Sequence, residues 1–110
     1  MTTLEKVRKL ERYLSLLTPE TEPVIDKTID KLLDRESMRL HELQATLRAQ
    51  LADFEKKYGM STEIFLERFE RGEQGDAMDY MEWAATSEML VNSEKHLRIL
   101  VEESNHESPH

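Results

Sequence analysis

The chain has 110 residues, of which 38% are hydrophobic and 35% charged, and it has a net charge of −8 and no cysteine. Because soluble domains average about 45–50% apolar and about 25% charged residues, this composition predicts one domain with a thin core, and the missing cysteines exclude disulfides, thiolate catalysis and cysteine zinc sites. The acidic balance argues against a general nucleic-acid or membrane-surface binder, and without an apolar run of roughly 20 residues or a signal-peptide pattern we expect a cytoplasmic protein.

The sequence predicts an all-α fold of four helices, because its three glycines and three prolines fall at a few positions and leave long stretches without a helix breaker. The first helix is expected over residues 3–17, where apolar residues recur at spacings of three and four. Two prolines between residues 18 and 23 then predict a tight turn. A long second helix is expected over residues 23–58, because no glycine or further proline interrupts it.

The long second helix resembles one strand of a coiled coil. Two series of residues recur at intervals of seven: Leu33, Leu40, Leu47 and Phe54 form one series, and Ile29, Glu36, Leu43 and Gln50 form the other. The polar Glu36 and Gln50 break the second series. Because Leu32 and Leu51 stand beside them, we favour an apolar stripe that drifts around the helix over a polar device that fixes the register.

The first helix is too short to cover the second. A helix of about 35 residues is roughly 52 Å long, whereas 15 residues cover about 22 Å. The stripe from Leu40 to Tyr58 therefore needs the remaining chain or another molecule, and we expect a homodimer or higher oligomer, with the fourth helix folding back as the monomeric alternative. The residues assigned to oligomerisation are Leu40, Leu43, Leu47, Leu51 and Phe54.

Two shorter signals divide the rest of the chain. Gly59 follows two lysines and predicts the end of the second helix, while Ser61 is a plausible cap for a third helix over residues 62–71. Asp76 is the expected cap of a fourth helix over residues 76–102. Residues 1–103 are thus expected to form a single helical domain, followed by a disordered tail over residues 104–110.

Templates for catalysis and metal binding do not match the sequence. A di-metal helical bundle needs Glu-x-x-His pairs, but the residues three before His41 and His96 are Met38 and Ser93. No phosphate-binding loop, dinucleotide fingerprint or nucleophile elbow is present. We therefore expect no metal, no cofactor and no enzymatic activity, although a cryptic enzyme with a polar pocket remains a formal alternative.

The charge and the aromatic residues are concentrated in the second half of the chain. Residues 1–59 contain eleven acidic and eleven basic side chains, whereas residues 60–110 contain twelve acidic and four basic ones. Six of the seven aromatic residues lie between positions 54 and 83. One interpretation is a packed corner with a solvated acidic rim, favoured for Phe54, Phe65, Phe69 and Trp83. The other is a partner-binding surface on which some of Tyr80, Trp83, Met78 and Met81 stay exposed.

The segment KYGMSTEIFLERFERGEQGDAMDYMEWAATSEML, Lys57–Leu90, is similar to small bacterial and archaeal proteins regarded as antitoxin components of toxin–antitoxin pairs. The positions that carry this resemblance are Tyr58, Gly59, Met60, Phe65, Gly72, Gly75, Asp76, Asp79, Glu82 and Trp83. The resemblance implies a non-catalytic protein that binds and silences a basic toxin enzyme. No DNA-binding module is recognisable, so it implies no direct binding of nucleic acid.

An inhibitory surface is accordingly expected within residues 69–83. Its partner-binding residues would be Phe69, Glu73, Asp76, Asp79, Tyr80, Glu82 and Trp83. Of these, Phe69 and Trp83 would mainly shape the surface, and the others would contact the partner. The acidic members would match a basic cleft on the partner, because complementary charge raises the rate of association. The alternative function is a scaffold protein that self-associates through the second helix.

Overall fold

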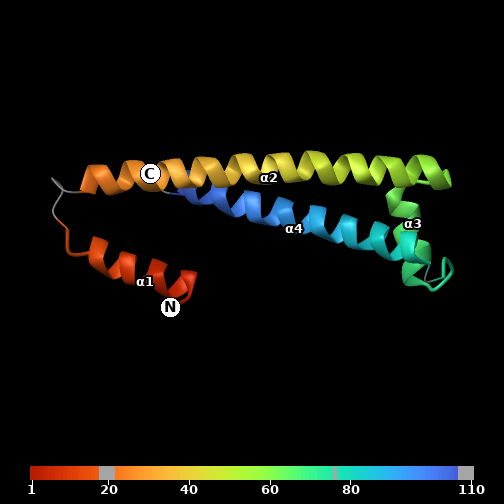
Figure 1. Ribbon diagram of the computed structural model, residues 1–110, viewed down its shortest axis with the longest axis horizontal. Helices are drawn as coiled ribbons and strands as arrows, with labels where there is room; N and C mark the ends of the chain where they lie inside the picture. Colours follow the sequence, from red (N-terminus) through yellow and green to blue (C-terminus); the bar gives the residue numbers. More distant parts are fainter. Residues whose placement is uncertain (18–21, 76, 107–110) are drawn as a thin grey trace. The chain divides into compact units, whose positions relative to one another are not determined.

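The computed structural model contains four α-helices in the order α1 (Thr3–Leu14), α2 (Glu22–Tyr58), α3 (Thr62–Glu70) and α4 (Met78–His106) (Figure 1). It describes residues 1–17, 22–75 and 77–106, with side chains described for 1–17, 23–75 and 77–101, and no strand occurs among them. The all-α prediction, with short first and third helices and long second and fourth helices, is confirmed. None of the helices in these ranges combines the length and the apolar character that crossing a membrane requires.

The chain forms two compact units, Met1–Arg35 and Glu36–His110. In the first unit α1 begins with a capping box: the Thr2 hydroxyl accepts a hydrogen bond from the Glu5 amide at 3.1 Å, and the Glu5 carboxylate accepts one from the Thr2 amide at 2.7 Å. This bonding lowers the pKa of Glu5. The helix ends at Leu14, three residues before the predicted end, and none of its residues is buried.

In the second unit, the distal part of α2 and the helix α4 pack antiparallel. Arg48 pairs with Glu94 at 3.2 Å and Lys57 pairs with Asp79 at 2.7 Å. The later residue of α2 thus contacts the earlier residue of α4, so the two helices run in opposite directions. Figure 1 shows α3 at the end where α2 finishes and α4 starts. Within one chain the fourth helix thus folds back along the distal part of the second, which leaves the oligomeric state a prediction.

The residues assigned to oligomerisation are covered within one chain. Leu40 and Leu47 are 3% exposed and Leu51 is 8% exposed, while Leu43 and Phe54 are half-buried. They leave little apolar surface for a second copy while α4 is in place. A homodimer through this stripe stays a prediction, and it requires α4 to be displaced or exchanged between copies.

The register of the buried seam differs from the predicted heptads. The second heptad series places Gln50 on the seam, but Gln50 is exposed and the adjacent Leu51 is buried. The drift of the apolar stripe is therefore confirmed at this position. The same drift places Gln44, rather than Leu43, among the most buried residues, at 3% exposed. Nearer the start of the helix Leu32 is 61% exposed and Glu36 is half-buried, so the stripe does not shift to Leu32 there.

The corner between α2 and α3 forms as the local sequence predicts. Gly59 has φ of 66° and its amide donates to the Glu55 carbonyl at 2.8 Å, which ends α2. Ser61 caps α3 by accepting from the Ile64 amide at 3.2 Å, and the Glu55 carboxylate accepts from the Thr62 amide at 2.8 Å.

Three other predictions are tested only in part or not at all. The proposed cap Asp76 lies outside them. The helix α4 continues to His106, past the predicted end at residue 102, and residues 107–110 of the expected disordered tail are not described. That residues 1–103 form a single domain stays a prediction.

Candidate functional site

An aromatic corner forms where the end of α2, the helix α3 and the start of α4 meet. Phe65 and Trp83 are 0% exposed, and their rings are stacked with centroids 4.0 Å apart. Phe54 also stacks on Trp83, at 5.5 Å between centroids. The Trp83 indole N–H donates to the Thr62 hydroxyl at 3.0 Å, so the one polar atom of the indole is satisfied inside the corner.

Asp79 joins two side chains of α2 at the edge of this corner. Its carboxylate accepts from the Lys57 amine at 2.7 Å and from the Tyr58 hydroxyl at 2.5 Å. The hydrogen bonds from Lys57 and Tyr58 lower the pKa of Asp79. The bond to Asp79 in turn raises the pKa of Lys57 and of Tyr58. The three groups therefore stabilise one another as carboxylate, ammonium and neutral phenol.

Several predicted partner-binding residues make contacts within the chain. Trp83 is enclosed, and Asp79 is engaged by α2. Tyr80 is half-buried against Tyr58 and Phe65, at 5.2 and 5.8 Å between ring centroids. Phe69 is also half-buried, and its ring centroid lies 5.4 Å from that of Phe65. The packing interpretation thus describes most of the aromatic positions.

The remaining predicted residues have different surroundings. Glu73 is exposed and pairs with Arg71 at 3.2 Å, and Glu82 is exposed. Asp76 lies outside the described residues. Two methionines of the predicted surface, Met78 and Met81, are 75% and 56% exposed.

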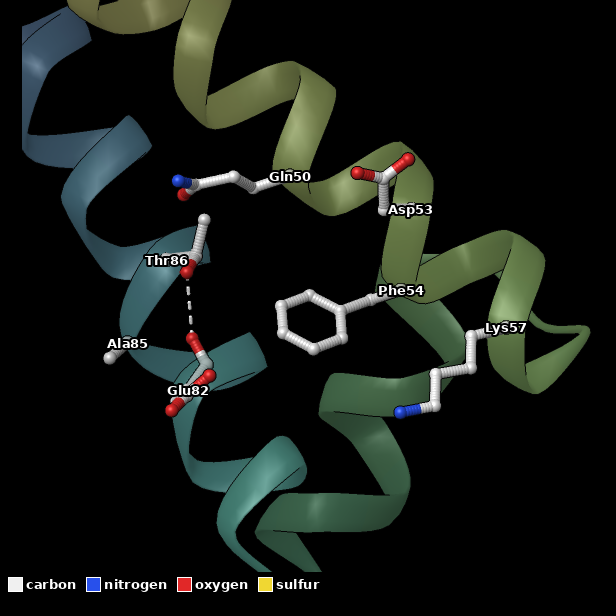
Figure 2. Close-up of a pocket in the computed structure, with 7 residues that line it drawn as sticks. All are labelled: Gln50, Asp53, Phe54, Lys57, Glu82, Ala85 and Thr86. Carbon is white, nitrogen blue, oxygen red and sulfur yellow. Dashed lines mark hydrogen bonds between the residues drawn. The ribbon is translucent and has the colours of Figure 1, made fainter.

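A groove between α2 and α4 opens beside the aromatic corner, and we call it the α2–α4 groove (Figure 2). It has a volume of about 430 Å³ and is lined by Gln50, Asp53, Phe54, Lys57, Glu82, Ala85 and Thr86. In Figure 2, Gln50 and Phe54 extend from α2 toward α4, and the Thr86 hydroxyl donates to the Glu82 carbonyl at 2.7 Å. Phe54 and Ala85 supply its apolar surface.

The charges around the α2–α4 groove are unequal. Asp53 and Glu82 bring two carboxylates to it, and neither takes part in the ion pairs found among the described residues. The lining cation, Lys57, binds Asp79 instead. The proximity of Asp53 to Glu82 was not predicted, because it depends on the return of α4 along α2.

A second groove, the α3–α4 groove, lies on the α3 side of α4. It has a volume of about 370 Å³ and is lined by Leu66, Phe69, Glu70, Ala84, Ser87, Glu88 and Val91. Its surface is apolar apart from Ser87 and the two glutamates. Phe69 is the member of the predicted partner-binding set that contributes to this groove.

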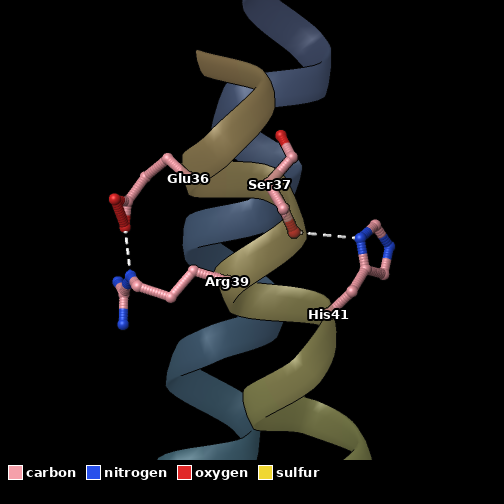
Figure 3. A network of polar contacts seen from close by, with 4 residues as sticks. All are labelled: Glu36, Ser37, Arg39 and His41. Atoms are coloured by element: carbon pink, nitrogen blue, oxygen red, sulfur yellow. Dashed lines mark hydrogen bonds and ion pairs between the residues drawn. The ribbon is translucent and has the colours of Figure 1, made fainter. Parts of the chain in front are cut away.

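Polar contacts elsewhere on α2 do not form a comparable site. Arg39 donates to the Glu36 carboxylate, and the His41 ring nitrogen Nδ1 lies 3.0 Å from the Ser37 carbonyl oxygen (Figure 3). Both contacts join exposed residues one helical turn apart, so they stabilise the surface of the helix. Across the described part of the chain, no three His, Asp or Glu side chains are grouped so as to hold a metal ion.

Comparison of the chain with protein-family models, with curated proteins and with solved structures finds no match.

Proposed function

We propose that this chain is a non-catalytic binding protein that holds a basic segment of a partner protein in the α2–α4 groove. The observation that carries the proposal is the pair of carboxylates, Asp53 and Glu82, beside the apolar surface of Phe54 and Ala85. A segment that presents apolar residues between lysines or arginines is chemically complementary to such a groove. The engagement of Lys57 by Asp79 supports this, because that cation is then neutralised within the chain.

The two kinds of groove residue have separate effects on binding. The carboxylates, together with the excess of acidic residues after position 60, attract a basic partner and raise the rate of association. Apolar contact with Phe54 lowers the rate of dissociation, because desolvated aromatic anchors carry much of the affinity of an interface.

The specific form of the proposal is an antitoxin-like inhibitor of a basic toxin enzyme, as the resemblance of Lys57–Leu90 implies. Asp79 and Tyr80 are then positioning residues that shape the corner together with Trp83, whereas Glu82 is a contact residue and Asp53 joins it.

The experiment measures binding to the purified product of the neighbouring open reading frame. Replacing Asp53 by Asn together with Glu82 by Gln should slow association at low salt and leave the helical content unchanged. The difference should shrink near 1 M salt, where the Debye length falls from about 8 Å to about 3 Å. A matched control, Glu42→Gln with Glu63→Gln, removes two exposed carboxylates outside the groove. Wild-type association by the groove variant would refute the proposal.

The scaffold alternative, self-association through α2, is less favoured by the geometry. The stripe on which it depends is covered by α4 within one chain, with Leu40 and Leu47 at 3% exposed.

A further inference from the structure

The helix α1 has an apolar face that nothing in its own unit buries. Leu4, Val7 and Leu10 are 57%, 54% and 38% exposed, and the stripe continues to Leu14 at the end of the helix. Isolated helices of fewer than about 12–15 residues are marginal in water, and α1 has 12 residues. A covering surface would therefore stabilise this helix.

The charge of α1 indicates what kind of surface fits it. Within residues 1–17 the basic side chains are Lys6, Arg8, Lys9 and Arg12, and the acidic ones are Glu5 and Glu11. The Glu5 carboxylate is occupied by the capping box. Glu11 lies on the apolar face, seven residues after Leu4, and Lys6 and Arg8 flank that face on its two sides. A basic, apolar-faced helix is complementary to an apolar surface with an acidic edge.

The α3–α4 groove has both properties. Leu66, Phe69, Ala84 and Val91 supply apolar surface, and Val91 is 45% exposed. Exposed Glu70 and Glu88 supply the acidic edge. The dimensions also agree, because α1 is about 18 Å long and the nine residues of α3 cover about 14 Å.

We propose that α1 of one copy docks in the α3–α4 groove of a second copy, with its apolar face on Phe69 and Val91 and its cations beside Glu70 and Glu88. Each copy then donates one helix and accepts one, which closes a two-fold dimer. This dimer differs from one built on the Leu40–Phe54 stripe, since it leaves α4 packed on α2. It is also independent of the proposed function, which uses the α2 side of α4.

The native chain contains no cysteine, which allows a disulfide trap. The full-length variants Val7→Cys and Val91→Cys each place one thiol at a position that is 54% or 45% exposed, so neither disturbs the core. Under mild oxidation an equal mixture should give a covalent dimer that contains one chain of each variant. Each variant alone should stay largely monomeric on a denaturing gel.

The trap has two outcomes that would overturn the proposal. A disulfide-linked dimer formed efficiently by Val7→Cys alone would show that two α1 helices pair with each other. A double variant that closes its disulfide within one chain, with no covalent dimer at tens of micromolar, would show that α1 covers the groove of its own copy.

Sedimentation equilibrium of the full chain gives a second measurement. The wild type should be dimeric at tens of micromolar, and Leu10→Glu should raise the dimer dissociation constant at least about tenfold by placing a charge on the docking face. The matched control Leu32→Glu changes a residue of α2 that is 61% exposed and should leave the constant unchanged. A monomeric wild type, or equal effects of the two variants, would refute the dimer.

Charge reversal tests the edge of the groove. Lys6 lies one turn before Leu10, beside the apolar stripe, whereas Lys9 lies away from it. Lys6→Glu should weaken the dimer more than Lys9→Glu, and adding Glu88→Lys should restore part of the loss. No rescue, together with equal effects of the two lysine variants, would refute docking beside Glu88.

Discussion

The indole of Trp83 lies flat against the ring of Phe65, with 4.0 Å between the ring centroids and 1° between the ring planes. Both side chains are 0% exposed, and they join α4 to α3. Phe54 extends the stack to α2. Three helices therefore share one aromatic core, and its stability determines whether the two grooves beside it keep their shape.

Thr62→Val should destabilise this core by about 1–3 kcal/mol, because valine keeps the shape of threonine but leaves the Trp83 N–H without its acceptor. Trp83 is the only tryptophan, so its fluorescence during urea unfolding reports on the corner itself. Thr28→Val is the control, since the Thr28 hydroxyl bonds the Val24 carbonyl on an exposed surface. Equal unfolding midpoints for wild type and Thr62→Val would contradict a structural role for the hydrogen bond.

Gly59→Val should cost roughly 1–2 kcal/mol of stability, because a β-branched residue is strained at a φ of 66°. Apart from the adjacent residues of the chain, no heavy atom lies within 4 Å of the position of an added Cβ, so backbone strain rather than a clash causes the loss. Gly59→Asn should cost less, since asparagine adopts the left-handed conformation more readily. Thermal unfolding of the wild type, Gly59→Asn and Gly59→Val should give midpoint temperatures that decrease in that order. A Val variant as stable as the wild type would show that the turn does not need the glycine.

The Asp79 network should make stability depend on pH at both ends of the range. The pKa of folded Asp79 is lowered, so its contribution is present above the usual carboxyl pKa of about 3.9 and is lost as pH falls through the folded value. The pKa values of Lys57 and Tyr58 are raised, so their contributions are present below the usual values of about 10 and are lost as pH rises through the folded values.

Asp79→Asn should therefore destabilise the protein most between about pH 5 and 9, and the difference from wild type should shrink toward pH 2. Urea unfolding across this range measures the effect, with Glu42→Gln as an exposed control. A difference that stays constant with pH would show that the network contributes by shape and not by charge.

The helices could be predicted from the sequence because their signals are local. Ser61 and Gly59 stand within a few residues of the helix ends that they form, and leucine spacing reports helical period directly. The face of α2 that meets α4 could be predicted only in part. Leu40 and Leu47 were placed correctly, but Gln44 was missed because a polar residue gives no hydrophobic signal of burial.

The candidate site was harder to predict because its residues are distant in sequence. Asp79 was expected to face a partner, yet Lys57 and Tyr58 reach it from α2, where they lie 22 and 21 residues earlier. Asp53 likewise becomes a neighbour of Glu82 only when α4 folds back along α2. Composition identified an acidic, aromatic region, but it did not reveal which acids are used inside the chain.

Gln44→Leu should stabilise the protein by about 1–3 kcal/mol. Gln44 is 3% exposed in the seam between α2 and α4, and its side-chain Nε2 has no hydrogen-bond partner among the described residues. A buried donor without a partner costs about that much, whereas leucine has a similar volume and no polar atom. The control is Gln50→Leu, which changes an exposed glutamine of the same helix and should alter stability by less than about 0.5 kcal/mol.

Urea unfolding followed by circular dichroism measures both variants, and sedimentation at the same concentrations reports their assembly. Loss of stability in Gln44→Leu would contradict the prediction and show that the amide is satisfied in solution. A more stable variant that also forms new oligomers would show that Gln44 selects the pairing of α2 with its own α4, because a single polar group in a helical seam can fix register and partner at a cost in stability.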